Sequence, residues 1–312
     1  MSDDTGHARP TPYAAPAADP RTTVAMITRN RRESVLCVLD RLADLPERPP
    51  VIVVDNASQD GTAAAARAHR AGARVLAPGR NTGALGRNLA VRHAVTPYVA
   101  FSDDDSWWTP GALRAAADLL DAHPRLGLLA ARTVVGPERS EDPLNAALAG
   151  SPLPPAADLP GRPVLGFLGC ACVVRRTAFL DAGGYHGVLF FGAEETLLAY
   201  DLAARGWGLS YVPTVIARHD PDSGARPGRS ALLRRNALLT DWLRRPLRLA
   251  LRRTVRLAVR AAAGDPDSVS ALHGVLARLP KALRRRRALP LAVEKAARCL
   301  DEHRDRTGGR TR

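Results

Sequence analysis

The chain of 312 residues is 46% hydrophobic and carries a formal charge of +14 at pH 7. Such a length and apolar content allow a substantial buried core, which excludes an intrinsically disordered protein. The charge is uneven, because residues 225–312 contain 23 Lys and Arg against 7 Asp and Glu, whereas the preceding residues contain 22 against 24. The basic character therefore belongs to a C-terminal segment and excludes a chain that is basic throughout.

Nothing in the sequence predicts a membrane-crossing or exported protein. Residues 1–20 carry acids, prolines and alanines without an apolar h-region, which is typical of a flexible arm rather than a signal peptide. No run reaches the roughly 18 apolar residues of a membrane span. The cysteines (Cys37, Cys170, Cys172 and Cys299) form no paired framework, so we expect a reducing, cytoplasmic compartment and interpret Cys170 and Cys172 as core residues.

Short β-branched runs alternate with helical patterns through the first half of the chain. The predicted strands are 23–27, 51–54, 74–77, 98–102 and 126–134, and the predicted helices are 32–45, 62–69, 84–95 and 110–122. Further along, 164–174 is predicted as a strand, 194–205 as a helix, and 208–212 and 214–217 as closing strands. The alternation predicts an α/β fold with a mainly parallel central sheet and helices on both faces.

Three polar clusters follow predicted strands: Thr28-Arg29-Asn30, residues 55–61, and residues 102–106. Ligands bind outside the carboxyl ends of the strands in such sheets, so these clusters indicate a site. The last cluster contains Asp103-Asp104-Asp105 directly after an apolar run. Because adjacent carboxylates repel one another, we expect a cation or a set of donors beside them.

Five motifs give these clusters a family context: VVDNASQDGT, RNTGALGRN, FSDDD, GAEETLL and VIARH. In their order and rough spacing, over about residues 22–219, the chain resembles the family-2 glycosyltransferases, inverting enzymes with the GT-A nucleotide-diphosphosugar transferase fold. The resemblance implies transfer of a sugar from a UDP-, GDP- or dTDP-linked donor to an acceptor hydroxyl. It also implies a divalent metal, Mg²⁺ or Mn²⁺.

The aspartate cluster matches the D-x-D motif of that family. The resemblance implies that Asp105 ligates the metal, that Asp103 takes part in metal or ribose binding, and that Asp104 meets the ribose or a bridging water. His219 matches a histidine that reaches the metal or the diphosphate. Carboxylates hold such ions together with substrate phosphates. The alternative is a solvated acidic turn that caps the next helix.

Other polar residues are assigned to the donor nucleotide. Thr28 and Asn30 follow the first strand, and the resemblance places Asp55 beside the base, although an Asx turn explains it too. Asn81 and Arg87 flank glycines and a predicted helix start, where an anion is favoured, so we place Arg87 near the diphosphate. A solvated arginine is the alternative.

The catalytic candidates are Glu194 and Glu195, which match the family's acidic pair. Inverting transfer needs a carboxylate within reach of the acceptor hydroxyl, and Glu195 is the predicted general base. This glutamate departs from the family's usual aspartate, and Glu194 is assigned to acceptor binding. Trp107 and Trp108 are predicted on the acceptor side, where a ring can stack, with packing beneath the loop as the alternative.

The motifs divide the chain into an arm (1–20), a GT-A catalytic domain (21–222) and a basic helical extension (223–312). Within the catalytic domain we expect a donor half (21–135), a mobile loop (136–163) and an acceptor half (164–222). In 243–260, arginines at 248, 252, 256 and 260 adjoin a row of Leu and Val, as in an amphipathic helix. Such a helix suits docking on an anionic membrane, at the inner face of the cell membrane, or packing as a cap on the catalytic domain. Binding to nucleic acid is disfavoured, because residues 243–260 offer no aromatic side chains to stack on bases.

Two other functions remain open at this point. A nucleotidyltransferase on a related sheet typically has a Gly-rich loop after the first strand, but residues 28–35 here contain no glycine. A non-catalytic module would retain nucleotide binding and use the basic extension as a scaffold on a membrane or a nucleic acid.

Overall fold

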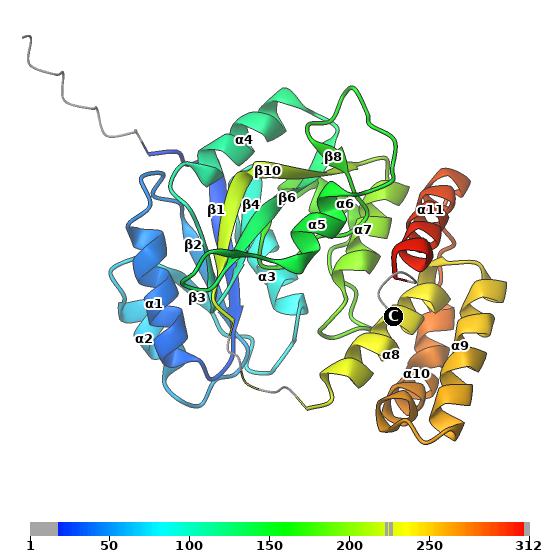
Figure 1. Ribbon diagram of the computed structural model, residues 1–312. Helices are drawn as coiled ribbons and strands as arrows, with labels where there is room; N and C mark the ends of the chain where they lie inside the picture. Colours follow the sequence, from blue (N-terminus) through cyan, green and yellow to red (C-terminus); the bar gives the residue numbers. More distant parts are fainter. Residues whose placement is uncertain (1–17, 222–223, 225–226, 309–312) are drawn as a thin grey trace, which may run out of the picture.

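The computed structural model describes residues 18–221, 224 and 227–308 (Figure 1). The predicted arm therefore lies outside the described residues, apart from 18–20. The strands are β1 (Thr22–Thr28), β2 (Val51–Asp55), β3 (Arg74–Leu76), β4 (Tyr98–Asp103), β5 (Ser106–Trp108), β6 (Leu126–Val135), β7 (Ser140–Glu141), β8 (Arg162–Pro163), β9 (Cys172–Arg175) and β10 (Gly208–His219). The helices are α1 (Arg32–Ala43), α2 (Thr62–Ala68), α3 (Leu85–His93), α4 (Ala112–Ala122), α5 (Pro143–Ala149), α6 (Arg176–Ala182), α7 (Glu195–Ala204), α8 (Arg229–Arg244), α9 (Leu247–Ala262), α10 (Pro266–Arg284) and α11 (Leu291–Gly308).

One sheet organises the described part of the chain. Its strand order is β3-β2-β1-β4-β9-β6-β10-β5, with β7 and β8 pairing at its margins. The β1–β2, β1–β4, β2–β3 and β6–β10 pairs are parallel, whereas β9 is antiparallel to both β4 and β6. The predicted α/β fold with a mainly parallel sheet is confirmed.

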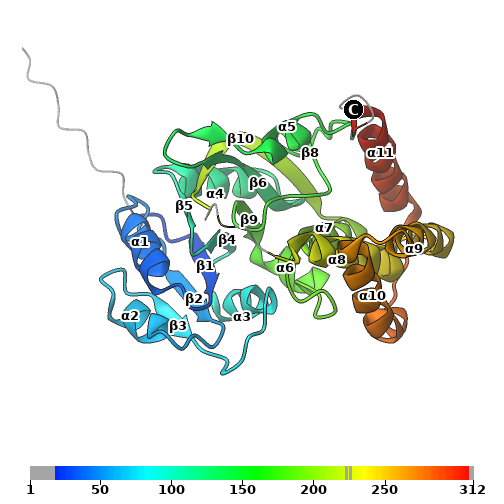
Figure 2. The ribbon, with the colours of Figure 1, turned by 60° about the horizontal axis from the view of Figure 1, so that its bottom comes forward.

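Apolar side chains cover both faces of the sheet, which is why β1 is buried at every position. On one face the strands pack against α1 and α4, through residues such as Leu39 and Leu113. On the other face they pack against α3, α6 and α7, through residues such as Phe101 and Phe179. Figures 1 and 2 show α1 and α2 at one side of the sheet and α8–α11 gathered at the opposite side, next to α7.

Four predictions are wrong in detail. The closing strands predicted at 208–212 and 214–217 form the single strand β10. Only Cys172–Arg175 of the predicted 164–174 strand is β-structure, because Gly166 and Gly169 weaken a strand there while the apolar side chains are buried without a ladder. The predicted loop 136–163 contains β7 and α5, and Asp142 caps α5 by accepting from Leu144 N at 2.8 Å. Pro246 divides the predicted helix at 243–260, since the residue before a proline is disfavoured in the α conformation.

The C-terminal helices share cores with the sheet domain. Helix α8 packs with Leu189 and Leu197 in one cluster, and Ala297 of α11 belongs to the cluster that covers one face of the sheet. Arg245, which is 1% exposed, donates to Glu294 at 2.8 Å and to Asp301 at 2.9 Å. This buried network links α11 to the end of α8.

We expect Arg245→Met to lower the free energy of unfolding by about 3–5 kcal/mol, because it removes the buried cation of the network and leaves Glu294 and Asp301 with more exposed arginines. Urea unfolding of the full chain measures the change. Arg298→Met is the matched control, since Arg298 pairs with the same Glu294 at 2.8 Å but is 62% exposed. Arg298→Met should lower the free energy of unfolding by no more than about 1 kcal/mol. Equal losses in the two variants would contradict the role of the buried network.

Candidate active site

Three neighbouring strands end at the same edge of the sheet. In the ladder, Thr28 of β1 lies opposite Asp55 of β2, and Ile27 lies opposite Asp103 of β4. The parallel register therefore brings together the three polar clusters that follow these strands, as the sequence predicted.

The aspartate cluster is held by donors from the β1 end. Thr28 Oγ1 donates to Asp104 Oδ2 at 2.7 Å. Arg31 lies between two carboxylates, with Nε 3.4 Å from Asp104 Oδ1 and Nη2 3.6 Å from Asp105 Oδ2. Burial raises the pKa of Asp104 to about 6, against the opposing effects of Thr28 and Arg31. The expected partners of the three like charges are thus present within the chain.

A cavity of about 410 Å³ opens beside these carboxylates, a size that suits a small-molecule ligand. One wall is polar and the other is apolar. The residues that line it are Ile27, Thr28, Arg29, Arg31, Asn56, Asn81, Gly83, Asp103, Asp104, Asp105, Phe190, Phe191, Leu232 and Arg235.

The loop after β2 forms one rim of this region. Asp55 is 3% exposed, and its Oδ2 accepts from Ser58 N at 3.1 Å, so the Asx turn is present. Its Oδ1 is buried and has no hydrogen-bond partner among the described residues. Asn30 connects the loop after β1 with the loop after β2, since its N donates to Ser58 Oγ and its Oδ1 accepts from Gln59 N, both at 2.8 Å. An orphaned buried acceptor points to a missing donor such as a ligand.

The glycine segment before α3 is ordered by two asparagines. Asn56 Oδ1 accepts from Thr82 N at 2.9 Å, and Asn81 Oδ1 accepts from Gly83 N at 2.9 Å. Gly83 has a φ of +57°, and a Cβ there would lie 2.4 Å from the carbonyl oxygen of Phe190. Only glycine suits that approach.

Asp105 and His219 meet at the end of β10, where His219 Nε2 lies 3.5 Å from Asp105 Oδ1. Burial alone would lower the pKa of His219, but the hydrogen bond and charge of Asp105 outweigh it and raise that pKa. Among residues 18–221, 224 and 227–308, no group of three or more His, Cys, Asp or Glu side chains forms a ready-made metal cluster. Asp103 of the expected ligand set instead pairs with Arg87.

Arg87 lies beneath the cavity and not at its surface. It is 2% exposed, donates through Nη2 to Asp103, and its Nη1 lies 3.6 Å from Glu194 Oε1. The guanidinium also lies over the rings of Phe101 and Tyr185, at 6.0 and 5.6 Å from their centroids. The alternative of a solvated arginine is wrong, and this charge joins Asp103 at the end of β4 to Glu194 of the acidic pair.

Glu194 and Glu195 stand at the start of α7. Burial raises the pKa of Glu194, and burial together with the charge of Glu194 raises the pKa of Glu195. A Cβ on Gly169 would lie 2.8 Å from Glu195 Oε1, so glycine leaves the room that this carboxylate needs. A carboxyl group with a raised pKa is suited to proton transfer near neutral pH.

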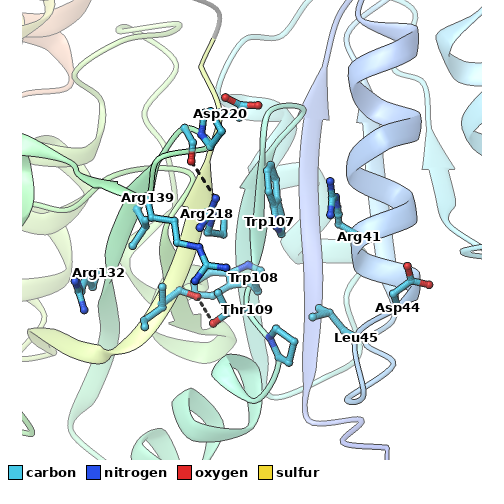
Figure 3. Close-up of a pocket in the computed structure, with 15 residues that line it drawn as sticks. Arg41, Asp44, Leu45, Trp107, Trp108, Thr109, Arg132, Arg139, Arg218 and Asp220 are labelled. Atoms are coloured by element: carbon cyan, nitrogen blue, oxygen red, sulfur yellow. Dashed lines mark hydrogen bonds between the residues drawn. The ribbon is translucent and has the colours of Figure 1, made fainter.

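The tryptophans lie away from the candidate donor cavity. Trp108 is 1% exposed and packs in the core with α1 and α4, so its predicted acceptor role is wrong and the packing alternative holds. Figure 3 shows both rings beside a second cavity, of about 690 Å³, with Arg41 against Trp107. The Arg41 guanidinium lies 5.5 Å from the Trp107 ring centroid, so this ring serves a cation–π contact.

Sequence reasoning missed several residues of the site: Arg31, Phe190, Phe191, Leu232 and Arg235. Phe190 and Phe191 are 41% and 38% exposed at the apolar wall of the cavity. The aromatic pair, which Gly192 and Ala193 separate from the acidic pair, was a usable signal. Leu232 and Arg235 come from α8, and nothing local in the sequence places that helix against the cavity.

Comparison with known proteins agrees with this geometry. The model of glycosyl transferase family 2 matches residues 23–183. A Mycobacterium tuberculosis protein named N-acetylglucosaminyl-diphospho-decaprenol L-rhamnosyltransferase is 30% identical, over 68% of this chain and 82% of its own length. Two solved structures share the fold. The mannosyltransferase PcManGT from Pyrobaculum calidifontis, solved with GDP-Man and Mn²⁺, has a TM-score of 0.54 and is 22% identical over 94% of this chain and 78% of that chain. S. aureus TarS 1–349, solved with UDP-GlcNAc, has a TM-score of 0.53 and is 17% identical over 89% of this chain and 91% of that chain.

The sheet and its flanking helices have the fold of the GT-A glycosyltransferases. The chain belongs to glycosyl transferase family 2, and its activity is glycosyl transfer. Within the described residues, no helix combines the length and apolarity that crossing a membrane requires.

The raised pKa of Glu195 predicts a pH-dependent cost in stability. A group that binds its proton more tightly in the folded chain stabilises the fold at low pH, and this contribution is lost as the pH rises from the ordinary pKa of 4.5 through the folded pKa of about 8. We expect Glu195→Gln to melt about 2–4 °C above the wild type at pH 8, and to match it near pH 4.

Calorimetry at the two pH values measures this difference. The control is Glu33→Gln, because Glu33 is 89% exposed and should change the melting temperature little at either pH. A Glu195→Gln effect of the same size at both pH values would contradict the assignment of the cost to ionisation.

Proposed function

We propose that the chain is a metal-assisted, inverting glycosyltransferase in which the β4 carboxylates serve the donor and the acidic pair at α7 serves the acceptor. The observation that carries this proposal is the buried Arg87, which contacts Asp103 on one side and Glu194 on the other. That side chain links a carboxylate of the donor cavity with Glu194, the residue directly before the candidate base Glu195.

The donor is a nucleotide-diphosphosugar. PcManGT and TarS, which share the fold, were solved with GDP-Man and with UDP-GlcNAc, and the curated relative is named for L-rhamnose. In this chain the buried, unpartnered Oδ1 of Asp55 supports a contact with a base N–H. Thr28, Asn81 and Asp104 line the cavity and would contact the nucleotide, whereas Asn30 would act by holding the loop after β2. Sugar rings pack on aromatic faces, so Phe190 and Phe191 provide an apolar wall for the sugar.

The side chains at this edge of the sheet include ligands that suit a divalent cation. Asp105 and His219 converge within 3.5 Å and would hold the ion, with the remaining ligands supplied by phosphate oxygens and water. A bound divalent cation would neutralise negative charge on the diphosphate as it departs. Arg31, beside Asp104 and Asp105, adds a positive charge at the same edge.

Glu195 is the proposed base. The acceptor oxygen attacks the anomeric carbon, the bond from that carbon to the diphosphate breaks with its electron pair, and the acceptor proton passes to the Glu195 carboxylate. Attack opposite the departing diphosphate inverts the configuration at that carbon. Glu194 and Arg87 form an ion pair beside the base, and this pair keeps Arg87 from moving toward solvent.

We expect Mn²⁺ to raise the affinity of the wild type for UDP, GDP or dTDP at least about tenfold, and Asp105→Asn to lose this increase because it removes a charged ligand. Calorimetric titration with and without Mn²⁺ measures it. Asp118→Asn, on the exposed surface of α4, is the control and should behave as the wild type. Glu195→Gln should keep the affinity and lower the transfer rate by about 10²–10⁴. A wild type without metal-dependent affinity for any of the three nucleotides would end the proposal.

We further propose that residues 21–222 form the catalytic domain and that the extension at 223–312 docks on an anionic membrane, at the inner face of the cell membrane. On α9, Leu247, Leu251, Val255 and Val259 are 50%, 57%, 55% and 63% exposed. Arginines at 248, 252, 256 and 260 lie next to this apolar row. The relative is named for a decaprenol-linked acceptor, which supports a lipid-linked acceptor here. An exposed apolar row flanked by cations suits the boundary between acyl chains and anionic headgroups.

We expect the chain to sediment with phosphatidylglycerol-containing vesicles, and to bind pure phosphatidylcholine vesicles more weakly. Leu251→Glu/Val255→Glu should weaken binding about tenfold or more, because it removes apolar area and adds repulsive charge. Val95→Glu is the matched control, since Val95 is 93% exposed but lies outside the C-terminal helices. Equal binding by both variants, or preference for duplex DNA over vesicles, would contradict this surface.

A further inference from the structure

Helix α8 of the C-terminal extension reaches the cavity. We propose that Asn236 and Arg235 are positioning residues, which hold the segment 189–193 and thereby set the place of the base Glu195. This inference rests on the proposed function of Glu195. It assigns to the extension a part in the catalytic geometry that is separate from membrane docking.

The segment 189–193 has a backbone that needs external support. Phe190 has a φ of +71° and Ala193 a φ of +56°, both in the left-handed region that disfavours residues with a Cβ. Such conformations persist only where the surroundings impose them, and they gather at functional sites. The segment ends directly before Glu194 and Glu195, so its conformation determines where α7 begins.

Two elements clamp this segment from different parts of the chain. On the α3 side, Ala84 N donates to Phe190 O at 2.8 Å. On the α8 side, Asn236 Nδ2 donates to the carbonyl oxygens of Phe191 and Gly192, the first at 2.8 Å. Arg235 Nη2 donates to Leu189 O at 3.0 Å. Four carbonyls in a row, from 189 to 192, are thus satisfied by donors outside the segment.

Asn236 is well placed for this role. It is fully buried, both protons of its amide are used on the segment, and its Oδ1 accepts from Arg235 Nε at 3.0 Å. The neighbouring Leu232 lines the cavity together with Phe190 and Phe191. One face of α8 therefore supports both the apolar wall and the approach to the base. Displacement of a catalytic group by about 1 Å can cost about 100-fold in rate, so loss of this support should appear in kcat.

The test is Asn236→Asp, which keeps the size of the side chain but turns an oxygen toward two carbonyl oxygens. We expect kcat for sugar transfer to fall about 10- to 100-fold. The acid limb of its pH profile should move to lower pH, because a loosened segment admits water to Glu195. Amide hydrogen exchange in 189–195 should accelerate relative to the wild type. Should the aspartate variant fail to fold, Asn236→Ala removes the same donors without the repulsion and is measured in the same way.

The matched control is Asn145→Asp. Asn145 is also buried, at 6% exposed, and its Nδ2 donates to Thr133 O at 2.7 Å, but it lies on α5 and outside the cavity lining. We expect a similar loss of melting temperature with kcat within about twofold and unchanged exchange in 189–195.

The two proposals fail in different ways. If the wild type transfers no sugar from UDP-, GDP- or dTDP-linked donors, including L-rhamnose, the proposed function is wrong, and hydrogen exchange still decides whether α8 holds the segment. If the wild type is active but the Asn236 variants keep its kcat, pH profile and exchange, the positioning role is overturned.

Discussion

The guanidinium of Arg87 is the contact on which the geometry of the site depends. It is buried between Asp103 at the end of β4 and Glu194 at the start of α7, and the faces of Phe101 and Tyr185 cover it. A buried charge is costly unless it is paired, and each carboxylate would be costly in turn without the arginine. The sheet and α7 are therefore fixed to each other at the point where donor and acceptor chemistry must meet.

The same reasoning explains the three consecutive aspartates. Asp103 pairs with Arg87, and Asp104 accepts from Thr28. Asp105 lies beside His219, and Arg31 lies between Asp104 and Asp105. Three like charges can then share a strand end, because none faces the others without compensation. Burial still raises the pKa of Asp104, as it raises that of Glu195 together with the charge of Glu194. Such raised pKa values are typical of sites that retain charge for function at a cost in stability.

The C-terminal helices have two faces with different surroundings. Toward the sheet domain, α8 contributes Leu232 and Arg235 to the cavity wall and Asn236 to the strained segment before the acidic pair. Toward solvent, α9 exposes an apolar row next to arginines. If both proposals hold, one group of packed helices carries both functions: α9 contacts the membrane and α8 positions the base. Membrane contact would then orient the active site toward a lipid-linked acceptor.

The sequence by itself determined the alternation of strands and helices, the three polar strand ends and the position of the acidic pair, because these follow from local periodicity and from motifs a few residues long. The strand predicted at 164–174 failed because apolar composition reports burial and not hydrogen bonding. Only the tertiary structure decided that Arg87 is buried between two carboxylates, that Trp108 faces the core, and that α8 lies against the segment 189–193. Those outcomes depend on which surfaces meet between segments some 40 to 100 residues apart along the chain, and no local pattern encodes that choice.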